Sequence, residues 1–316
     1  MIQMHRLPSR RVLGASFLLV IGSLILLQDS FKESLVSRGL QAGLKADLNV
    51  VRPTVEQLET KISNGDGEST FSAVNATIAI ATATTSRHIS SRPIDTMPLV
   101  ELMLPSLPGT VETDRYQYKL YVAIDTDDEF WMDPDHQQHV RDLALETSNV
   151  EAIFVEVPPE EGRQRVPFNE ACRKAYDDGA DYIVRINDDT EFISKYWASV
   201  GIAKLLSFSP PNFGVVGPTC KQGHQRIMTH DMTHRTHMEV FSLDYYPVGF
   251  GNIYLDNWIS GVYGGSRTAK LDNWYVYHHV RFTRYKLEDK VGYLHEMEYK
   301  SKKVIEKWLE SREHRL

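Results

Sequence analysis

The sequence predicts an α/β fold, with a mainly parallel sheet flanked by helices. Four short runs of apolar, small or β-branched residues, at 76–85, 118–125, 150–157 and 181–187, have the length and composition of buried strands. Stretches with helical spacing of their apolar residues lie between these runs. Strands that alternate with crossover helices predict a parallel sheet that is covered on both faces.

The first two strands each precede a predicted helix. "ATIAIATATT" at 76–85 is followed by "MPLVELMLPSL" at 97–107, and "YKLYVAID" at 118–125 by "DPDHQQHVRDLALE" at 133–146. The apolar residues of each second segment recur at the spacing of one helix face. We therefore expect two successive strand and helix units.

The third strand, "VEAIFVEV" at 150–157, leads to a helix at 167–180. In that helix Phe168, Cys172 and Ala175 recur at helical spacing, and Gly179 is suited to end it. The run "DYIVRIN" then predicts a fourth strand.

Composition limits the classes of function. The chain has 316 residues, of which 42% are hydrophobic and 10% aromatic, so it can bury a substantial core in one large or two small domains. Its 35 basic and 42 acidic residues give a formal charge of -7. Without a basic stripe or a nucleic-acid-binding motif, nucleic acid is not an expected partner.

The N-terminal segment predicts a membrane anchor. Arg6, Arg10 and Arg11 precede the uncharged segment 12–27, which as a helix would span about 24 Å, against roughly 30 Å for a hydrocarbon core. We expect residues 1–11 in the cytoplasm and the rest in the lumen, as a single-pass type II protein of the Golgi or ER membrane. A cleaved signal peptide is the alternative, and it also places the domain outside the cytosol.

Residues 28–74 have the composition of a stem or linker, and we expect the folded domain at 75–316. The triplet "NAT" at Asn75 is an N-glycosylation sequon, which fits a lumenal domain. Cys172 and Cys220 could form a disulfide in an oxidising compartment.

Acidic residues follow two of the predicted strands. The second strand ends in "DTDD", which includes Asp125 and Asp127, and the fourth in "NDD", Asn187 to Asp189. Ligands of parallel sheets bind at the carboxyl ends of the strands, and an oxygen-rich cluster there suits Mg²⁺ or Mn²⁺. The alternative is that these side chains cap turns and helices.

This order of strands, helices and acids resembles the GT-A fold glycosyltransferases, with "NDD" in the place of their DxD motif and Asn187 where that motif has its first Asp. The segments "VVGPTC", "THDMTHRTH", "YYPVGFGN" and "LDNWISGVYG" are similar to an uncharacterised, mostly algal and protist, branch of such transferases. The resemblance covers residues 75–305. It implies a Rossmann-like fold, a nucleotide-sugar donor and a Mn²⁺ or Mg²⁺ cofactor.

The resemblance also implies roles for residues on the donor side. Asp189 would hold the metal, together with a histidine from the pair His278 and His279. Because adjacent residues of an extended segment face opposite ways, only one of the two is expected to reach the site. The donor nucleotide would contact residues after three strands, namely Thr85, Arg87, Asp125, Asp127, Asn187 and Asp188.

On the acceptor side, Asp256 stands where inverting members of the family have their catalytic base. Asp256 is followed by Asn257, where a second acid is more frequent, and its alternative role is that of a helix N-cap. Asp231, His234 and Trp258 are candidate acceptor contacts. Aromatic side chains at this density are more often part of the core.

A third group of residues, His230, His234 and His237, has the spacing i, i+4 and i+7 of one helix face. Such a face can bind Zn²⁺, so a secreted zinc hydrolase is an alternative function. A catalytically inactive sugar-binding relative is another, given the asparagines at 187 and 257. The function that we expect is transfer of a sugar from a nucleotide diphosphate to a glycan or glycoprotein by a metal-dependent enzyme.

Overall fold

The computed structural model describes residues 76–89, 93–158, 166–222, 226–248, 254–280 and 291–313. The predicted tail, anchor and stem and the sequon at Asn75 lie outside the described residues, and the domain boundary at 74/75 stays a prediction. In the described part of the chain, no helix combines the length and the apolar character needed to cross a membrane. This finding contradicts the predicted location in the Golgi or ER membrane.

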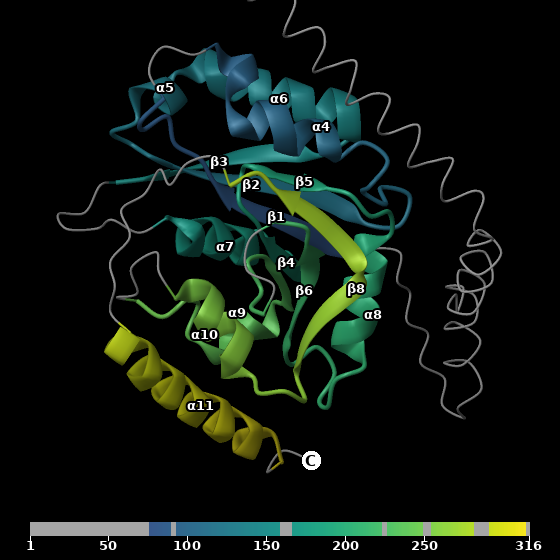
Figure 1. Ribbon diagram of the computed structural model, residues 1–316, viewed down its shortest axis with the longest axis vertical. Helices are drawn as coiled ribbons and strands as arrows, with labels where there is room; N and C mark the ends of the chain where they lie inside the picture. The colour runs from purple at the N-terminus through teal and green to yellow at the C-terminus, as the bar shows by residue number, and fades with distance from the viewer. Residues whose placement is uncertain are drawn as a thin grey trace, which may run out of the picture. The chain divides into compact units, whose positions relative to one another are not determined.

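The described strands form one sheet of eight, in the order β3-β2-β1-β4-β7-β6-β8-β5 (Figure 1). The strands are β1 (Thr77–Ala83), β2 (Gln117–Asp125), β3 (Glu151–Val157), β4 (Tyr182–Arg185), β5 (Thr190–Phe192), β6 (Val215–Cys220), β7 (Asp231–His234) and β8 (Thr268–His278). Strands β3, β2, β1 and β4 are parallel to one another. The predicted α/β class and its four strands are confirmed.

The second half of the sheet is mixed. Strand β7 pairs antiparallel with both β4 and β6, β6 runs parallel to β8, and β5 pairs antiparallel with the end of β8. In consequence, the end of β8 lies beside the segment that follows β4. This pairing joins two parts of the chain that are far apart in sequence.

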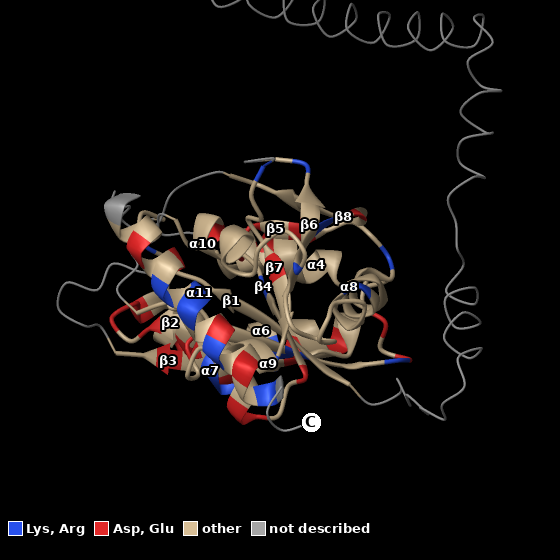
Figure 2. Cartoon of the chain, turned by 90° about the horizontal axis from the view of Figure 1, so that it is seen from below, with Lys and Arg blue, Asp and Glu red and all other residues tan. Residues whose placement is uncertain are grey.

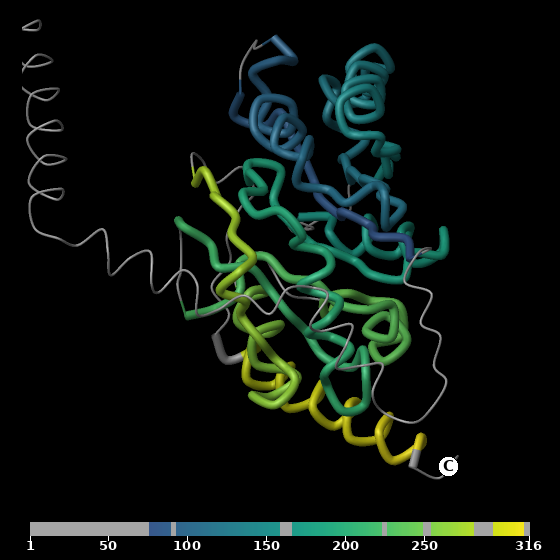
Figure 3. Tube along the Cα trace, turned by 90° about the vertical axis from the view of Figure 1, so that its right-hand side faces the viewer, coloured from purple at the N-terminus to yellow at the C-terminus, as the bar shows by residue number. Residues whose placement is uncertain are grey.

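Helices cover both faces of the sheet (Figures 1 and 3). Strand β1 shows why: Ile78 and Ile80 point into one core layer, and Ala79 and Ala81 point into the other. On the first face lie η2 (Ile94–Thr96), η3 (Leu99–Met103), α4 (Leu104–Ser106), α5 (Glu129–Met132), α6 (Pro134–Ser148) and α8 (Trp197–Leu206). On the second lie α7 (Phe168–Asp177), α9 (Thr236–Val240), α10 (Leu255–Val262) and α11 (Val291–Glu313).

Local sequence explains where the predicted helices begin and end. Asp133 caps α6 by accepting a hydrogen bond from the backbone N–H of Asp135 at 2.9 Å, and Asn149 ends it with a left-handed φ of 53°. The predicted helix at 97–107 is a π-helical turn followed by a short α-helix.

Helix α11 carries Lys and Arg interspersed with Glu along its length (Figure 2). Exposed ion pairs join Glu296 to Lys300 and Lys303 to Glu306. This mixture of charges is typical of a solvated helix face.

Candidate functional site

The predicted donor residues at the tips of β1 and β2 lie together. Because β1 and β2 are paired in parallel up to Ala83 and Ala123, the residues that follow them leave the sheet side by side. One Arg87 nitrogen lies 2.7 Å from Asp125 Oδ2 and the other 2.9 Å from Asp127 Oδ1. A guanidinium is thus held at the carboxyl edge of the sheet, where it can also face an anionic ligand.

Asp128 fixes the loop after β1, a role that the sequence did not assign to it. Its carboxylate accepts hydrogen bonds from Thr85 Oγ1 at 2.8 Å, from Ser86 N at 2.7 Å and from Ser86 Oγ at 2.6 Å. It also caps α5 through Trp131 N. The signal was present as two hydroxyl residues after one strand and an acid after the next, but only the sheet register shows that they meet.

At the tip of β4, the three residues of "NDD" face different partners. Asp188 is buried and accepts a hydrogen bond from Thr84 Oγ1 at 2.7 Å. Asn187 Nδ2 lies 3.1 Å from His278 Nε2, and Asp189 Oδ1 lies 3.0 Å from the same nitrogen. Asn187, Asp189 and His278 therefore converge, and Asp188 belongs to the support beneath them.

The pairing of β5 with β8 selects which histidine of the pair reaches Asp189. Thr190 lies opposite His278, and the backbone N–H of His279 donates to the carbonyl oxygen of Asp189 at 2.9 Å. The His279 side chain turns away, with Nε2 3.1 Å from Glu191 Oε1. His278 alone of the two faces Asp189, so the expected ligand role of His279 is not supported.

The side chains at Asp189 fit a divalent cation. A carboxylate oxygen and an imidazole nitrogen are ligands of Mn²⁺, and the imidazole suits Mn²⁺ better than Mg²⁺. Asn187 faces His278 with Nδ2, so its amide oxygen would become a ligand after rotation of the amide group. His278 faces Asp189 Oδ1 with Nε2 at 3.0 Å, and its other ring nitrogen, Nδ1, is buried and has no hydrogen-bond partner among the described residues. Its Nε2 is thus the nitrogen that faces the oxygen ligands.

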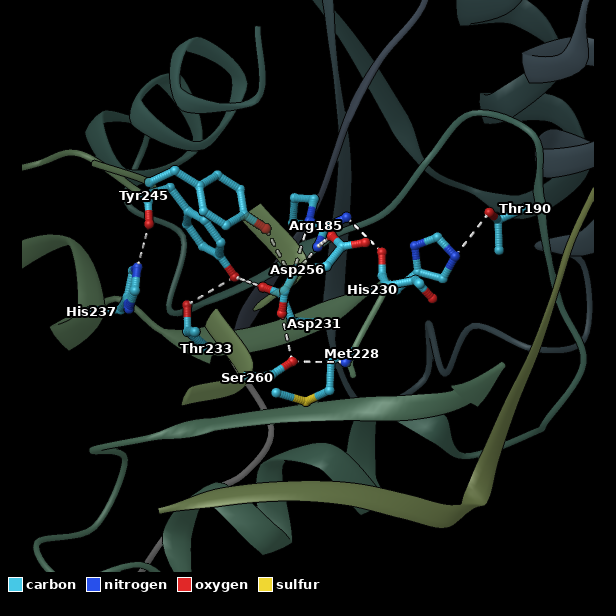
Figure 4. A network of polar contacts seen from close by, with 12 residues as sticks. Arg185, Thr190, Met228, His230, Asp231, Thr233, His237, Tyr245, Asp256 and Ser260 are labelled. Atoms are coloured by element: carbon cyan, nitrogen blue, oxygen red, sulfur yellow. Dashed lines mark hydrogen bonds and ion pairs between the residues drawn. The ribbon is translucent and has the colours of Figure 1, made fainter. Parts of the chain in front are cut away.

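Beneath the strand tips lies a buried cluster of charges (Figure 4). Arg185, the last residue of β4, lies opposite Asp231 in the β4 and β7 register, and its Nη2 is 2.6 Å from Asp231 Oδ2. Tyr246 donates a hydrogen bond to the same carboxylate at 3.0 Å, as does Tyr245. Phe168 and Tyr246 flank the guanidinium at 5.3 and 5.5 Å from their ring centroids.

Asp256 lies at the edge of this cluster. Its Oδ1 is 3.1 Å from Arg185 Nη2, and 34% of its side chain is exposed. Burial raises the pKa of Asp256 to about 6; Arg185 lowers it, Asp231 raises it further, and His278 lowers it. Near neutral pH the group is a carboxylate close to its own pKa, which suits it to accept a proton.

The structure corrects the alternative role of Asp256 as a helix N-cap. Helix α10 begins at Leu255 and its N-cap is Tyr254, so Asp256 lies in the first turn. A carboxylate there still interacts favourably with the helix dipole.

Three predicted acceptor contacts are not supported. Trp258 is fully buried and donates from Nε1 to Ser301 Oγ at 3.1 Å, and Asp231 is fully buried beside Arg185. His234 lies opposite Tyr182, at the beginning of β4, and therefore near the edge of the sheet away from Asp189. Trp258 and Asp231 are thus closed off from solvent, and His234 lies at the opposite end of β7 from Asp231.

The predicted zinc-binding helix face is wrong, because residues 231–234 are a strand. His230 precedes β7, with Nε2 3.2 Å from Thr190 Oγ1. His237 lies in α9, where its nitrogens are 2.8 Å from Tyr263 Oη and 2.8 Å from the carbonyl oxygen of Tyr245. The three histidines have separate partners, and the zinc hydrolase loses its ligand set.

No protein-family model matches the chain, and no curated protein does. Several solved structures are similar to it. One is a mannosyltransferase from Pyrobaculum calidifontis in complex with GDP-Man and Mn²⁺, with 13% identity and a TM-score of 0.43, covering 65% of this chain and 56% of that one. Another is TarS from S. aureus, with 11% identity and a TM-score of 0.40, covering 64% and 60%.

A third is glucosyl-3-phosphoglycerate synthase from Mycobacterium tuberculosis in complex with Mg²⁺ and UDP, with 12% identity and a TM-score of 0.40, covering 80% of this chain and 83% of that one. Identities and TM-scores this low carry no conclusion about activity. In fold, the chain is similar to GT-A nucleotide-diphospho-sugar transferases.

Proposed function

We propose that this protein is a metal-dependent glycosyltransferase that moves a sugar from a nucleotide diphosphate donor to a glycan or glycoprotein. The observation that carries the proposal is the convergence of Asp189 and Asn187 with His278 within 3.0 to 3.1 Å. These groups come from the ends of two distant strands and meet at the carboxyl edge of the parallel sheet. Ligands of such sheets bind at that edge.

The reaction breaks the bond between the anomeric carbon of the sugar and the diphosphate oxygen. A new bond forms from that carbon to an acceptor hydroxyl oxygen, and the hydroxyl proton leaves. Negative charge develops on the departing nucleoside diphosphate. A divalent cation held by Asp189, His278 and Asn187 would neutralise that charge.

Other residues near the site would contact the nucleotide and accept the proton of the acceptor. Arg87, held between Asp125 and Asp127, is a cation at the tips of β1 and β2, which suits contact with the nucleotide. Thr85 helps to hold that loop through Asp128. Asp256 is the group suited to take the acceptor proton, because its raised pKa makes it a stronger base than an ordinary aspartate.

The direct test is to incubate the full purified chain with nucleotide sugars, Mn²⁺ and a panel of simple glycosides as acceptors. We expect release of nucleoside diphosphate that depends on one donor and is abolished by chelation. The substitution Asp189→Asn keeps the side-chain shape but removes the charge, and it should lower the rate by roughly 100-fold.

Glu191→Gln is the matched control, since this carboxylate faces His279 instead of His278. It should leave the rate close to that of the unaltered chain. Equal rates for Asp189→Asn and the unaltered chain would refute the proposed metal site. Binding of a nucleotide sugar without any turnover across the panel would refute the transferase and favour the inactive sugar-binding relative.

A further inference from the structure

A second set of metal ligands meets on the other side of His278. Cys220 is the last residue of β6, His230 precedes the first residue of β7, and His278 is the last residue of β8. Strand β6 pairs with both β7 and β8, which brings these three ends together. One ligand atom from each residue lies within 4.8 Å of those of the other two.

Two ring nitrogens in this group lack partners. His230 is fully buried and uses Nε2 towards Thr190, and its Nδ1 has no hydrogen-bond partner among the described residues. His278 uses Nε2 towards Asp189, and its Nδ1 likewise has none there. Buried polar atoms without a partner are uncommon in folded proteins because their desolvation is not compensated. A bound cation would satisfy both nitrogens at once.

The third group is a thiol with a nearby acceptor. The Cys220 sulfur lies 2.6 Å from the carbonyl oxygen of Gln222, and Cys220 and Cys172 form no disulfide. On metal binding the thiol would lose its proton to solvent and become a thiolate.

Close packing supports this arrangement. A Cβ atom at Gly217 of β6 would lie 2.5 Å from the carbonyl oxygen of His230 and 2.8 Å from Met228 Sδ. Only glycine allows β6 to lie this close to the segment that carries His230. Cys220 is held near His230 by the same approach.

We propose that Cys220, His230 and His278 bind a borderline-soft divalent cation of the zinc class. One thiolate and two imidazoles are typical zinc ligands, and three protein ligands leave a fourth tetrahedral position to water or to a further group. The site differs in chemistry from the oxygen-rich position at Asp189. His278 belongs to both groups, but a neutral imidazole binds a cation through one nitrogen only, because the other carries the proton. A cation bound through Nδ1 at Cys220 would leave Nε2 as an N–H donor towards Asp189 and would fix the ring in that direction.

Cobalt reports on such a site without any nucleotide sugar. We would titrate the metal-free full chain with Co²⁺ and record its absorption spectrum. We expect the intense visible bands of tetrahedral cobalt and the ultraviolet band of a thiolate bound to cobalt, and both should saturate at about one Co²⁺ per chain. Absence of the thiolate band in the unaltered chain would overturn the proposal, whatever the variants do.

The two cysteines give a matched pair of variants. Cys220→Ala should lose the thiolate band, and Cys172→Ala, which removes a buried thiol from α7, should keep it. An unchanged band in Cys220→Ala also contradicts the proposal. His230→Gln should weaken Co²⁺ binding at least tenfold while thermal unfolding confirms that the chain still folds. The cobalt spectrum is measured without any nucleotide sugar, so it is independent of the transferase assay. Either proposal can therefore be refuted while the other is upheld.

Discussion

Arg185 and Asp231 form an ion pair inside the protein, with 2.6 Å between Nη2 and Oδ2 and with 2% and 0% of their side chains exposed. The pair joins β4 to β7, and Asp256 is a second acid bound to the same guanidinium. Removing the cation would leave two acids near each other in a largely dry environment.

We therefore predict that Arg185→Met lowers the free energy of unfolding by about 3 to 5 kcal/mol. Arg173 is the matched control: it pairs with Asp244 at 2.7 Å on the surface, so Arg173→Met should cost about 0 to 1 kcal/mol. Urea unfolding of both variants measures the difference. An equal decrease in the free energy of unfolding for both variants would show that burial does not increase the contribution of the Arg185 ion pair to stability.

The two adjacent histidines should differ in their effect on manganese affinity. Loss of an outer-shell partner of a metal typically weakens binding roughly 10-fold to 100-fold, and loss of a ligand should weaken it at least as much. His278→Gln removes the nitrogen that faces Asp189, whereas His279→Gln removes one that faces Glu191.

Electron paramagnetic resonance of free Mn²⁺ measures this affinity directly. We expect at least tenfold weaker binding for His278→Gln and little change for His279→Gln. Stronger weakening by His279→Gln would mean that Asp189 and His278 do not form the manganese site.

Transfer should depend on pH through Asp256. Burial raises the pKa of this carboxyl to about 6, so the basic form is present above that pH and is lost below it. The rate with the natural donor should fall with decreasing pH, with a midpoint near that value, and should level off above it.

Asp256→Asn should remove the acidic limb of this profile together with most of the activity. Circular dichroism confirms that the variant folds. An active Asp256→Asn variant with the same acidic limb would assign the proton acceptor to another group.

Acid should destabilise the fold through His237. Its ring is buried, and desolvation lowers its pKa from 6.5 to about 4. In the unfolded chain His237 takes up a proton as the pH falls through 6.5, whereas in the folded chain it stays neutral down to about pH 4. The folded state therefore keeps its full stability above pH 6.5 and loses part of it as the pH falls from 6.5 towards 4. His237 alone should lower the free energy of unfolding by about 2 kcal/mol between about pH 7 and pH 5.

Urea unfolding at several pH values tests this prediction. His237→Gln should make the curve of stability against pH flatter, although His234, with a pKa of about 4, adds a loss in the same direction. His295 is exposed, so His295→Gln should leave the curve unchanged. The prediction fails if both variants show the slope of the unaltered chain.

Much of the fold follows from local sequence. Strand β1 alternates Ile and Ala because it is covered on both faces, and α6 begins at an Asp and a Pro and ends at an Asn. Strand β7 was not predictable in this way. Its segment has histidines at helical spacing, and the strand forms because Asp231 and His234 pair with residues of β4 that lie far away in sequence.

In the candidate site, too, some features follow from local sequence and others depend on contacts between distant parts of the chain. Alternation along an extended segment predicted that only one of two adjacent histidines would reach Asp189, and His278 is that residue. The density of aromatic residues around Trp258 already favoured its burial, which the hydrogen bond to Ser301 of α11 confirms. Asp231 carries no sequence mark of its burial, which depends on the pairing with Arg185. The meeting of Cys220 with His230 depends on the order of strands in the sheet.

Gly217 supplies no ligand, but the missing methyl group sets the gap across which Cys220 and His230 face each other. Alanine is as apolar as glycine, but its methyl group would push the end of β6 away from the segment that carries His230. The distance between Cys220 and His230 would then no longer suit a bound cation. Metal affinity would then be governed by steric volume at a residue that never touches the ion.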